Sequence, residues 1–172
     1  MRILEGKHAG RHLTSPGAKV RPTPEDVRGR VLDLLAEDLE KARVLDLFAG
    51  SGAVGLEALS RGARSVDFVE NGTGALHSLK ANVAALRESK YTRIFKKDAI
   101  PWVERLEAGR YDIAYADPPY GSRKLDRILS YWLQTPFSRI LVLEHDKEHA
   151  IESKAKQYDF EGPTRISILR AP

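Results

Sequence analysis

Residues 43–55 read R-V-L-D-L-F-A-G-S-G-A-V-G, in which an apolar run is followed by a glycine-rich segment. The run has the length and composition of a buried strand. Gly50, Gly52 and Gly55 have the G-x-G-x-x-G spacing, and glycines there let the backbone turn tightly and lie against a ligand. The stretch therefore predicts a strand, a ligand-binding turn and a helix near 53–61, which together begin an α/β fold.

The alternation of strand and helix patterns continues along the chain. Strands are expected at 43–48, 65–70, 93–98, 111–116 and 139–144, and helices near 24–39, 53–61, 73–88, 100–108 and 123–134. Repeated βα units predict a Rossmann-like, doubly wound and mostly parallel sheet with helices on both faces. The tail at 157–170 has Gly162-Pro163 at its centre and predicts an antiparallel hairpin, which brings the expected sheet to seven strands.

The N-terminal residues add a separate feature to this core. Residues 2–13 predict a small β-hairpin, and Thr23-Pro24-Glu25-Asp26 predicts a helix start with Thr as the N-cap. A chain of 172 residues has room for one domain with a sizeable core. We therefore expect a single α/β domain over 1–172, with a basic hairpin and loop at 1–22 and a helix plus the sheet core at 23–172.

The positive charge is concentrated at the N-terminus. The net charge is +4, and residues 1–30 carry seven Lys and Arg against three Asp and Glu, whereas the rest of the chain is balanced. A basic segment on a neutral body favours a polyanionic partner such as nucleic acid. A solvated end that only aids solubility accounts for the charge equally well.

Composition limits the location and the chemistry. Cysteine is absent, which fits a reducing compartment and excludes disulfides, thiolate metal ligands and a cysteine nucleophile. No apolar run approaches a membrane span and no secretory pattern begins the chain, so we expect a cytoplasmic, monomeric protein without a membrane partner. Residues 145–149 read H-D-K-E-H and fit a zinc-binding pattern, but they begin at a strand end without a third ligand, so a solvated polar turn and no metal site are expected.

Four acidic residues close or nearly close predicted strands: Asp46, Glu70, Asp98 and Asp117. Because ligands of doubly wound folds bind at the carboxyl ends of the strands, these acids are expected on one rim. Asp46 precedes the glycines and suits a cationic ligand better than a pyrophosphate. Glu70 can accept ribose hydroxyls, and Asp98 can accept an adenine amino group. S-adenosylmethionine combines these three features, although each acid taken alone could instead be a helix N-cap.

Residues 117–120 read D-P-P-Y and leave the fourth predicted βα strand. An amine on a base is a poor nucleophile because its lone pair is delocalised into the ring. Asp117 and the carbonyl of Pro118 can accept its two N–H bonds and turn the lone pair toward a methyl donor. Pro118 and Pro119 restrict the backbone and donate no N–H, and Tyr120 can stack on an extruded base. The alternative is a rigid turn without chemistry.

Longer motifs resemble a known family. V-L-D-L-F-A-G-S-G (44–52) resembles motif I of the class I S-adenosylmethionine-dependent methyltransferases, and D-P-P-Y (117–120) resembles their amino-methylating motif IV. Three further stretches resemble the bacterial 16S ribosomal RNA guanine-N2 methyltransferases of the RsmD type: M-R-I-L-E-G-K-H-A-G-R (1–11), R-P-T-P-E-D-V-R (21–28) and G-L-E-A-L-S-R-G-A (55–63). The resemblance covers most of the chain.

The resemblance implies S-adenosylmethionine-dependent methylation of a guanine N2 amino group in 16S ribosomal RNA, which would be bound alone or in a partly assembled small ribosomal subunit. It implies a cofactor pocket formed by Asp46, Phe48, Ala49, Gly50, Ser51, Gly52, Gly55, Glu70, Asn71, Asp98, Ala99 and Asp117. The guanine would be held by Asp117, Pro118, Pro119 and Tyr120. RNA contacts are expected from Arg2, Lys7, Arg11, Arg21, Pro22, Thr23 and Arg28.

Three other functions remain open from the sequence. A nicotinamide-dependent oxidoreductase shares the glycine spacing, and binding of S-adenosylmethionine would exclude it. A DNA or other RNA amino-methyltransferase acting on adenine N6 shares both motifs, and a comparison of naked DNA with ribosomal RNA as substrates would distinguish it. A non-catalytic RNA-binding protein would bind ribosomal RNA without transferring a labelled methyl group.

Overall fold

Seven strands form one sheet in the computed structural model, which describes residues 1–17, 23–151 and 154–172. The strands are β1 (Arg43–Leu47), β2 (Ser65–Glu70), β3 (Thr92–Lys96), β4 (Tyr111–Ala116), β5 (Ser138–Asp146), β6 (Lys156–Asp159) and β7 (Thr164–Arg170). Their order is β3-β2-β1-β4-β5-β7-β6, in which β1 to β5 are parallel and β7 is antiparallel to both β5 and β6. The predicted α/β fold, with its mostly parallel sheet and C-terminal antiparallel pair, is confirmed.

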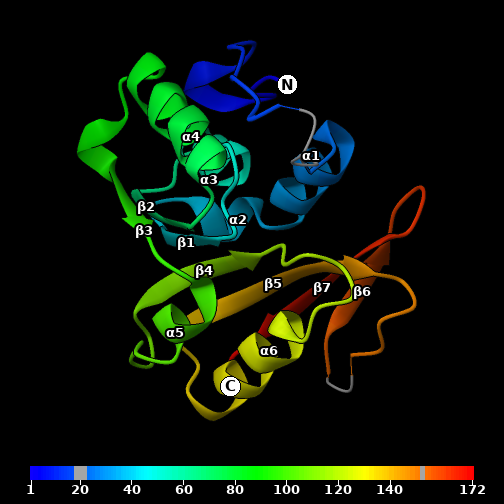
Figure 1. The fold of residues 1–172 in the computed structure, drawn as a ribbon. Coiled ribbons are helices and arrows are strands. Elements are labelled where there is room, and N and C mark those ends of the chain that lie inside the picture. Colours follow the sequence, from blue (N-terminus) through cyan, green and yellow to red (C-terminus); the bar gives the residue numbers. More distant parts are fainter. Residues whose placement is uncertain (18–22, 152–153) are drawn as a thin grey trace.

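Helices cover both faces of this sheet (Figure 1). The helical elements are η1 (Gly6–His8), α1 (Glu25–Leu34), α2 (Ala36–Leu39), α3 (Ala53–Ser60), α4 (Thr73–Ala85), η2 (Ser89–Tyr91), α5 (Ala99–Val103) and α6 (Lys124–Gln134). Successive strand residues point to opposite faces, so Val44 packs with α1 to α4 and Leu45 packs with α5 and α6. Within the described residues no helix is long and apolar enough to cross a membrane.

The strand order reverses between β1 and β4. From β1 the chain moves outward through β2 to β3, then returns to add β4 on the other side of β1. Crossover connections leave on opposite sides of such a point, which opens a crevice at the carboxyl ends of the two central strands. The fold thereby places a ligand site beyond Leu47 and Ala116.

The helix predicted at 24–39 is divided in two. α1 ends at Leu34 and α2 begins at Ala36, with Leu35 between them at φ −107° and fully buried. Thr23 is not the N-cap of α1, because Pro24 occupies that position. The hydroxyl of Thr23 instead donates to Glu144 Oε2 of β5 at 3.2 Å. A tertiary contact has replaced the predicted local one.

The N-terminal segment (residues 1–13) forms the small antiparallel hairpin predicted for it, closed around η1. A single antiparallel bridge joins Arg2 to His12 around η1. The loop is held from outside by Glu57 of α3, whose carboxylate accepts the backbone N–H groups of Leu4 and Glu5, each at 2.9 Å. Cross-strand bonds also join its two arms, because the Ile3 N–H donates to the Arg11 carbonyl at 2.9 Å and the Leu13 N–H donates to the Met1 carbonyl at 3.0 Å.

The strand β5 continues two residues beyond its predicted end at 144. His145 is therefore a strand residue and is buried, with its Nε2 atom 2.8 Å from the Ser167 hydroxyl of β7. The turn predicted for 145–149 is wrong at its first two residues, because pairing with β7 extends to Asp146.

Candidate active site

A cavity of about 550 Å³ lies at the carboxyl ends of the central strands. Its volume is within the range of small-molecule sites. The cavity is lined by Pro16, Thr23, Asp46, Phe48, Ala49, Gly50, Ser51, Ala53, Val54, Glu70, Asn71, Tyr115, Asp117, Pro118, Pro119, Tyr120, Lys124 and Glu144. It therefore unites the glycine-rich segment, the D-P-P-Y segment and residues that precede α1.

The loop between β1 and α3 forms one wall of the cavity. Phe48 has a φ of 58°, which is uncommon for a residue other than glycine and is typical of functional sites. Gly52 has a φ of 80°, and a Cβ atom there would lie 2.3 Å from a leucine side chain of α4. A Cβ atom at Gly55 would lie 2.4 Å from a phenylalanine ring of β2. Gly52 thus makes room for α4 and Gly55 lets α3 approach the sheet, whereas residues 48–51 line the cavity.

Asp46 lies in β1 and lines the cavity with a buried side chain. The residue is 2% exposed, and its carboxylate accepts the backbone N–H of Gly55 at 3.0 Å, which joins β1 to the first turn of α3. Burial raises the pKa of Asp46 to about 8; the charge of Glu70 adds to the rise and the Gly55 hydrogen bond opposes it. A cationic ligand group beside it would favour the ionised carboxylate.

Glu70 connects the end of β2 to the glycine-rich loop. Its carboxylate accepts the backbone N–H groups of Gly50 at 2.8 Å, Asn71 at 2.9 Å and Gly72 at 2.7 Å. Glu70 and Asn71 both line the cavity. Since three backbone donors hold it, this carboxylate has a fixed position, and a hydroxyl of a ligand would share its oxygens with the loop.

Asp98 and Ala99 do not line this cavity. Asp98 is the N-cap of α5 and accepts the backbone N–H of Ile100 at 3.0 Å. It borders a smaller cavity of about 310 Å³ together with Trp102, and Ala99 is buried. Of the four strand-end acids, Asp98 is the one for which the local capping role accounts for the observed contacts.

The D-P-P-Y segment lines the cavity with all four of its residues. Tyr120 is 40% exposed, and its hydroxyl lies 3.1 Å from the Thr164 hydroxyl of β7, which anchors the ring at the rim. Nearby, the Nζ atom of Lys124 lies 5.5 Å from the centre of the Phe48 ring. The four residues predicted to hold a base amine therefore lie at one site with Asp46 and Glu70.

Sequence reasoning missed three polar residues of the cavity, Tyr115, Lys124 and Glu144. The Tyr115 hydroxyl donates to Glu144 Oε2 at 2.5 Å, and both residues are buried. Burial, followed by the charge of Glu144, raises the pKa of Tyr115 well above its ordinary value, so this hydroxyl stays a neutral donor. The signal for Glu144 was present, because it is the last residue of the strand predicted at 139–144.

The charge of the cavity is negative. Four of its lining residues are carboxylic acids and one is a lysine: Asp46, Glu70, Asp117, Glu144 and Lys124. An apolar-walled site with this balance of charge favours a cationic ligand and disfavours a phosphate-bearing one. This observation separates the site from a dinucleotide site with the same glycine spacing.

The basic residues of the N-terminal segment lie away from the cavity. Lys7 pairs with Glu88 at 2.6 Å, and the Arg11 guanidinium donates to the Ala85 carbonyl at 2.9 Å. Both contacts are at the C-terminal end of α4, whereas α4 begins at the carboxyl end of β2, next to the cavity. A helix of 13 residues is about 20 Å long, so one ligand reaching both places would extend along α4.

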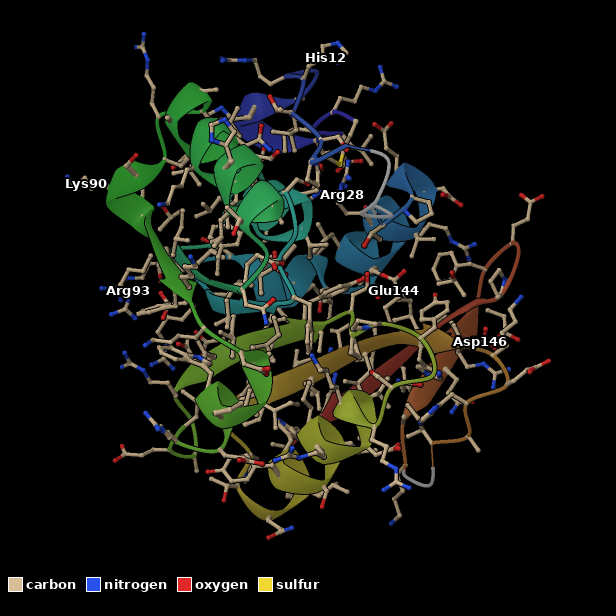
Figure 2. All side chains as sticks on the ribbon, in the orientation of Figure 1. His12, Arg28, Lys90, Arg93, Glu144 and Asp146 are labelled. Atoms are coloured by element: carbon tan, nitrogen blue, oxygen red, sulfur yellow. The ribbon has the colours of Figure 1, made fainter. Side chains whose placement is uncertain are left out.

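Arg2 and Arg28, which were also predicted to contact RNA, do not lie at the end of α4. Arg2 is exposed, and its backbone N–H donates to Glu25 at 2.8 Å. Arg28 is 1% exposed; it pairs with Glu57 at 3.4 Å and donates to the Arg2 carbonyl, between α1 and the N-terminal segment (Figure 2). The surface role predicted for Arg28 is corrected to a buried structural role. Arg21 and Pro22 lie outside the described residues.

Comparisons with known proteins match most of the chain. Residues 1–161 match the family described as Conserved hypothetical protein 95. A Bacillus subtilis protein named "Putative rRNA methyltransferase YlbH" is 33% identical over 86% of this chain and 84% of that protein. Ribosomal RNA small subunit methyltransferase D of Buchnera aphidicola is 26% identical over 87% and 80%. A solved Escherichia coli structure, "Putative methyltransferase yhhF", has a TM-score of 0.84 at 27% identity, over 98% and 96%.

Proposed function

The chain belongs to the Conserved hypothetical protein 95 family and is an RsmD-type methyltransferase, and on this premise we propose that it methylates the N2 amino group of a guanine in small-subunit ribosomal RNA. S-adenosylmethionine is the proposed methyl donor. The observation that supports this function best is one cavity in which the glycine-rich loop, the strand acids Asp46 and Glu70 and the D-P-P-Y segment meet.

The residues of the cavity fit S-adenosylmethionine. When bound, this cofactor supplies an electrophilic methyl group on a sulfonium. The buried carboxyl of Asp46 suits its cationic amino-acid end, and the carboxylate of Glu70 suits its ribose hydroxyls. The loop at 48–51 contributes backbone surface without large side chains beyond Phe48. The cavity volume is also adequate for a ligand of this size with room for part of a base.

The D-P-P-Y segment would hold the acceptor amine. The Asp117 carboxylate accepts one N–H of the guanine N2 group, and the Pro118 carbonyl accepts the other, so the nitrogen lone pair is directed toward the methyl group. Tyr120 at the rim can stack on the extruded base, which contributes about 1–3 kcal/mol. These residues supply orientation and charge, which dominate a direct transfer between two bound groups.

Ribosomal RNA is proposed as the partner on two grounds. The names of relatives state this substrate for those proteins, and the N-terminal 30 residues carry the whole net positive charge of this chain. RNA bound with one base in the cavity could extend along α4 to Lys7 and Arg11. A partly assembled small subunit presents the same RNA and is the second form to be tested.

The deciding experiment locates the methyl group. Small-subunit rRNA from cells with and without the protein is digested and compared by mass spectrometry, and the purified protein is then supplied with labelled S-adenosylmethionine and rRNA from the deficient cells. The expected result is one N2-methylguanine that disappears without the protein and returns in vitro. Methylation of adenine N6 instead would favour the other amino-methyltransferase function, and binding without transfer would refute an enzymatic role.

A further inference from the structure

We propose that Glu144 selects guanine at the acceptor site by accepting a hydrogen bond from the N1–H of the base, beside Asp117, which holds the exocyclic amine. The inference rests on the proposed function, because it concerns the base whose amine is methylated. Glu144 lines the same cavity as Asp117 but has no role in the methyl transfer proposed for Asp117 and Pro118.

The two acids lie at the same level along their neighbouring chain segments. β4 and β5 are parallel neighbours, and the last registered pair between them is Ala116 with Leu143. Asp117 and Glu144 are the residues that follow this pair, and both line the cavity. Figure 2 shows Glu144 on β5, between the sheet and α1. The acceptor half of the cavity therefore carries two carboxylic acids from adjacent strands.

The Glu144 side chain is oriented by two hydroxyl groups. Tyr115 donates to its Oε2 atom at 2.5 Å and Thr23 donates to the same atom at 3.2 Å. Glu144 is 3% exposed, so protein contacts, these two among them, define its position. Tyr115 stays protonated because burial disfavours its phenolate. Both donors thus present Glu144 to the cavity as a hydrogen-bond acceptor.

The chemistry of the bases matches two neighbouring acceptors. Guanine has adjacent donors on one edge, the N1–H and the N2 amino group, and an ionised carboxylate only accepts. Asp117 would accept a hydrogen bond from the amine and Glu144 would accept one from N1–H, so both donors of that edge would be paired. Adenine has an unprotonated N1 next to its amine, so a carboxylate there would face a second acceptor. A site built for a substrate N–H discriminates strongly against an analogue that lacks it.

A purely structural role for Glu144 predicts a different outcome. If the carboxylate served only to bind Tyr115 and Thr23, its loss would affect every base equally, since neither contact involves the substrate. The base 2-aminopurine separates the two roles. It has the same exocyclic amine as guanine, but its N1 is an acceptor without hydrogen.

The experiment uses rRNA that carries guanine or 2-aminopurine at the mapped position and compares kcat/KM for the wild type, Glu144→Gln and Tyr115→Phe. The wild type should prefer guanine by about tenfold or more. Glu144→Gln should lose most activity on guanine and keep or gain activity on 2-aminopurine, because an amide N–H can donate to N1. Tyr115→Phe keeps the carboxylate, so it should lower both rates and preserve the preference.

The outcomes are separable. Equal wild-type rates on the two bases would overturn the proposal without any variant, and so would equal losses on both bases in Glu144→Gln. Calorimetric binding of S-adenosylmethionine by each variant shows that it is folded. Failure of the proposed function is a distinct result, because then the mapped position would contain no N2-methylguanine from which to start.

Discussion

Asp117 is the residue on which the proposed transfer depends most. It follows β4 and lines the cavity with both prolines. Asp117→Ala removes one of the two acceptors of the amine, so transfer should fall by roughly 10²–10³-fold or more, as for other preorganised hydrogen-bonding groups. Binding of S-adenosylmethionine should persist, because Asp46 and Glu70 are unchanged. Labelled methyl transfer measures the first effect, and calorimetry measures the binding of S-adenosylmethionine.

A matched control for this variant is Asp126→Ala. Asp126 lies on α6, is exposed, pairs with His149 and is not among the residues that line the cavity. It should keep full transfer activity. Unchanged transfer in Asp117→Ala would eliminate the proposed mechanism, and loss of cofactor binding there would reassign Asp117 to the cofactor.

Asp46 should make cofactor binding depend on pH. The pKa of Asp46 is about 8 in the free protein, and a cation beside it favours the ionised form. Binding should therefore release a proton below pH 8, and the affinity should rise by up to about tenfold per pH unit until pH 8 and then level off. Calorimetry in two buffers of different ionisation enthalpy measures this proton, and Asp46→Asn should abolish its release.

The same group affects the stability of the free protein in the opposite direction. The native state holds the Asp46 proton more tightly than the unfolded chain, whose aspartates titrate near pH 4. This contribution is fully present below about pH 4 and is lost as the pH rises from about 4 to 8. In Asp46→Asn, the free energy of unfolding should decline less over that range than in the wild type.

The roles of individual residues were predictable from the sequence only for acids at or near the ends of predicted strands. Asp46, Glu70 and Asp117 were found because each ends or nearly ends a predicted strand, and the structure brings them to one cavity. Asp98 also ends a predicted strand, but it is the N-cap of α5. The sequence alone does not show whether such an acid caps a helix or contacts a ligand. Arg28 was assigned to the surface because its burial against α3 is a tertiary property.

Among the elements, α3 connects the cavity to the N-terminal segment. Its first turn follows the glycine-rich loop, and its buried Glu57 pairs with Arg28 at 3.4 Å and with Arg61 at 3.1 Å. Glu57→Ala would remove the carboxylate that pairs with the buried Arg28 guanidinium. It should lower the free energy of unfolding by about 3–5 kcal/mol, as measured by urea denaturation.

Glu37→Ala on α2 is the control for this effect. Glu37 is exposed, so the change in the free energy of unfolding should be within about 0.5 kcal/mol. A similarly small change in Glu57→Ala would show that the buried ion pairs do not hold the N-terminal segment. Restoration by Glu57→Gln, which keeps hydrogen-bonding atoms, would assign the loss to hydrogen bonds rather than to charge.

Strands were predicted better than the irregular parts. β2 and β4 have the predicted bounds, since an apolar run between polar turns marks a buried strand. The break at Leu35 was missed because apolar residues at 34 and 35 continue the helical pattern, although one is exposed and the other buried. The N-terminal hairpin was predicted from its local pattern, but its anchoring on Glu57 was not, because Glu57 lies more than 50 residues away in the sequence.

For the whole molecule, the location of charge predicts how RNA is bound. Lys7 and Arg11 lie at the end of α4 that is remote from the cavity. Replacing both with alanine should weaken RNA binding and reduce the slope of log affinity against log salt by up to about 2, while transfer at saturating RNA is retained. Binding is measured by filter retention over a range of salt concentrations.

Arg127→Ala provides the comparison on the opposite face. Arg127 is an exposed residue of α6, on the face of the sheet that the N-terminal segment does not cover (Figure 1). Its loss should leave the salt slope unchanged. If the wild type, the double variant and Arg127→Ala had the same slope of log affinity against log salt, RNA would not bind along α4.

The strand order also has a consequence for synthesis of the chain. β1 lies between β2 and β4, so its second edge stays unpaired until Tyr111–Ala116 has been made. At about 5–20 residues per second, the ribosome needs roughly 3–13 seconds to proceed from Leu47 to Tyr111. During that interval the nascent chain exposes an apolar strand edge that can pair with another chain. The strand that leads into the proposed cofactor site is therefore open to incorrect pairing during synthesis.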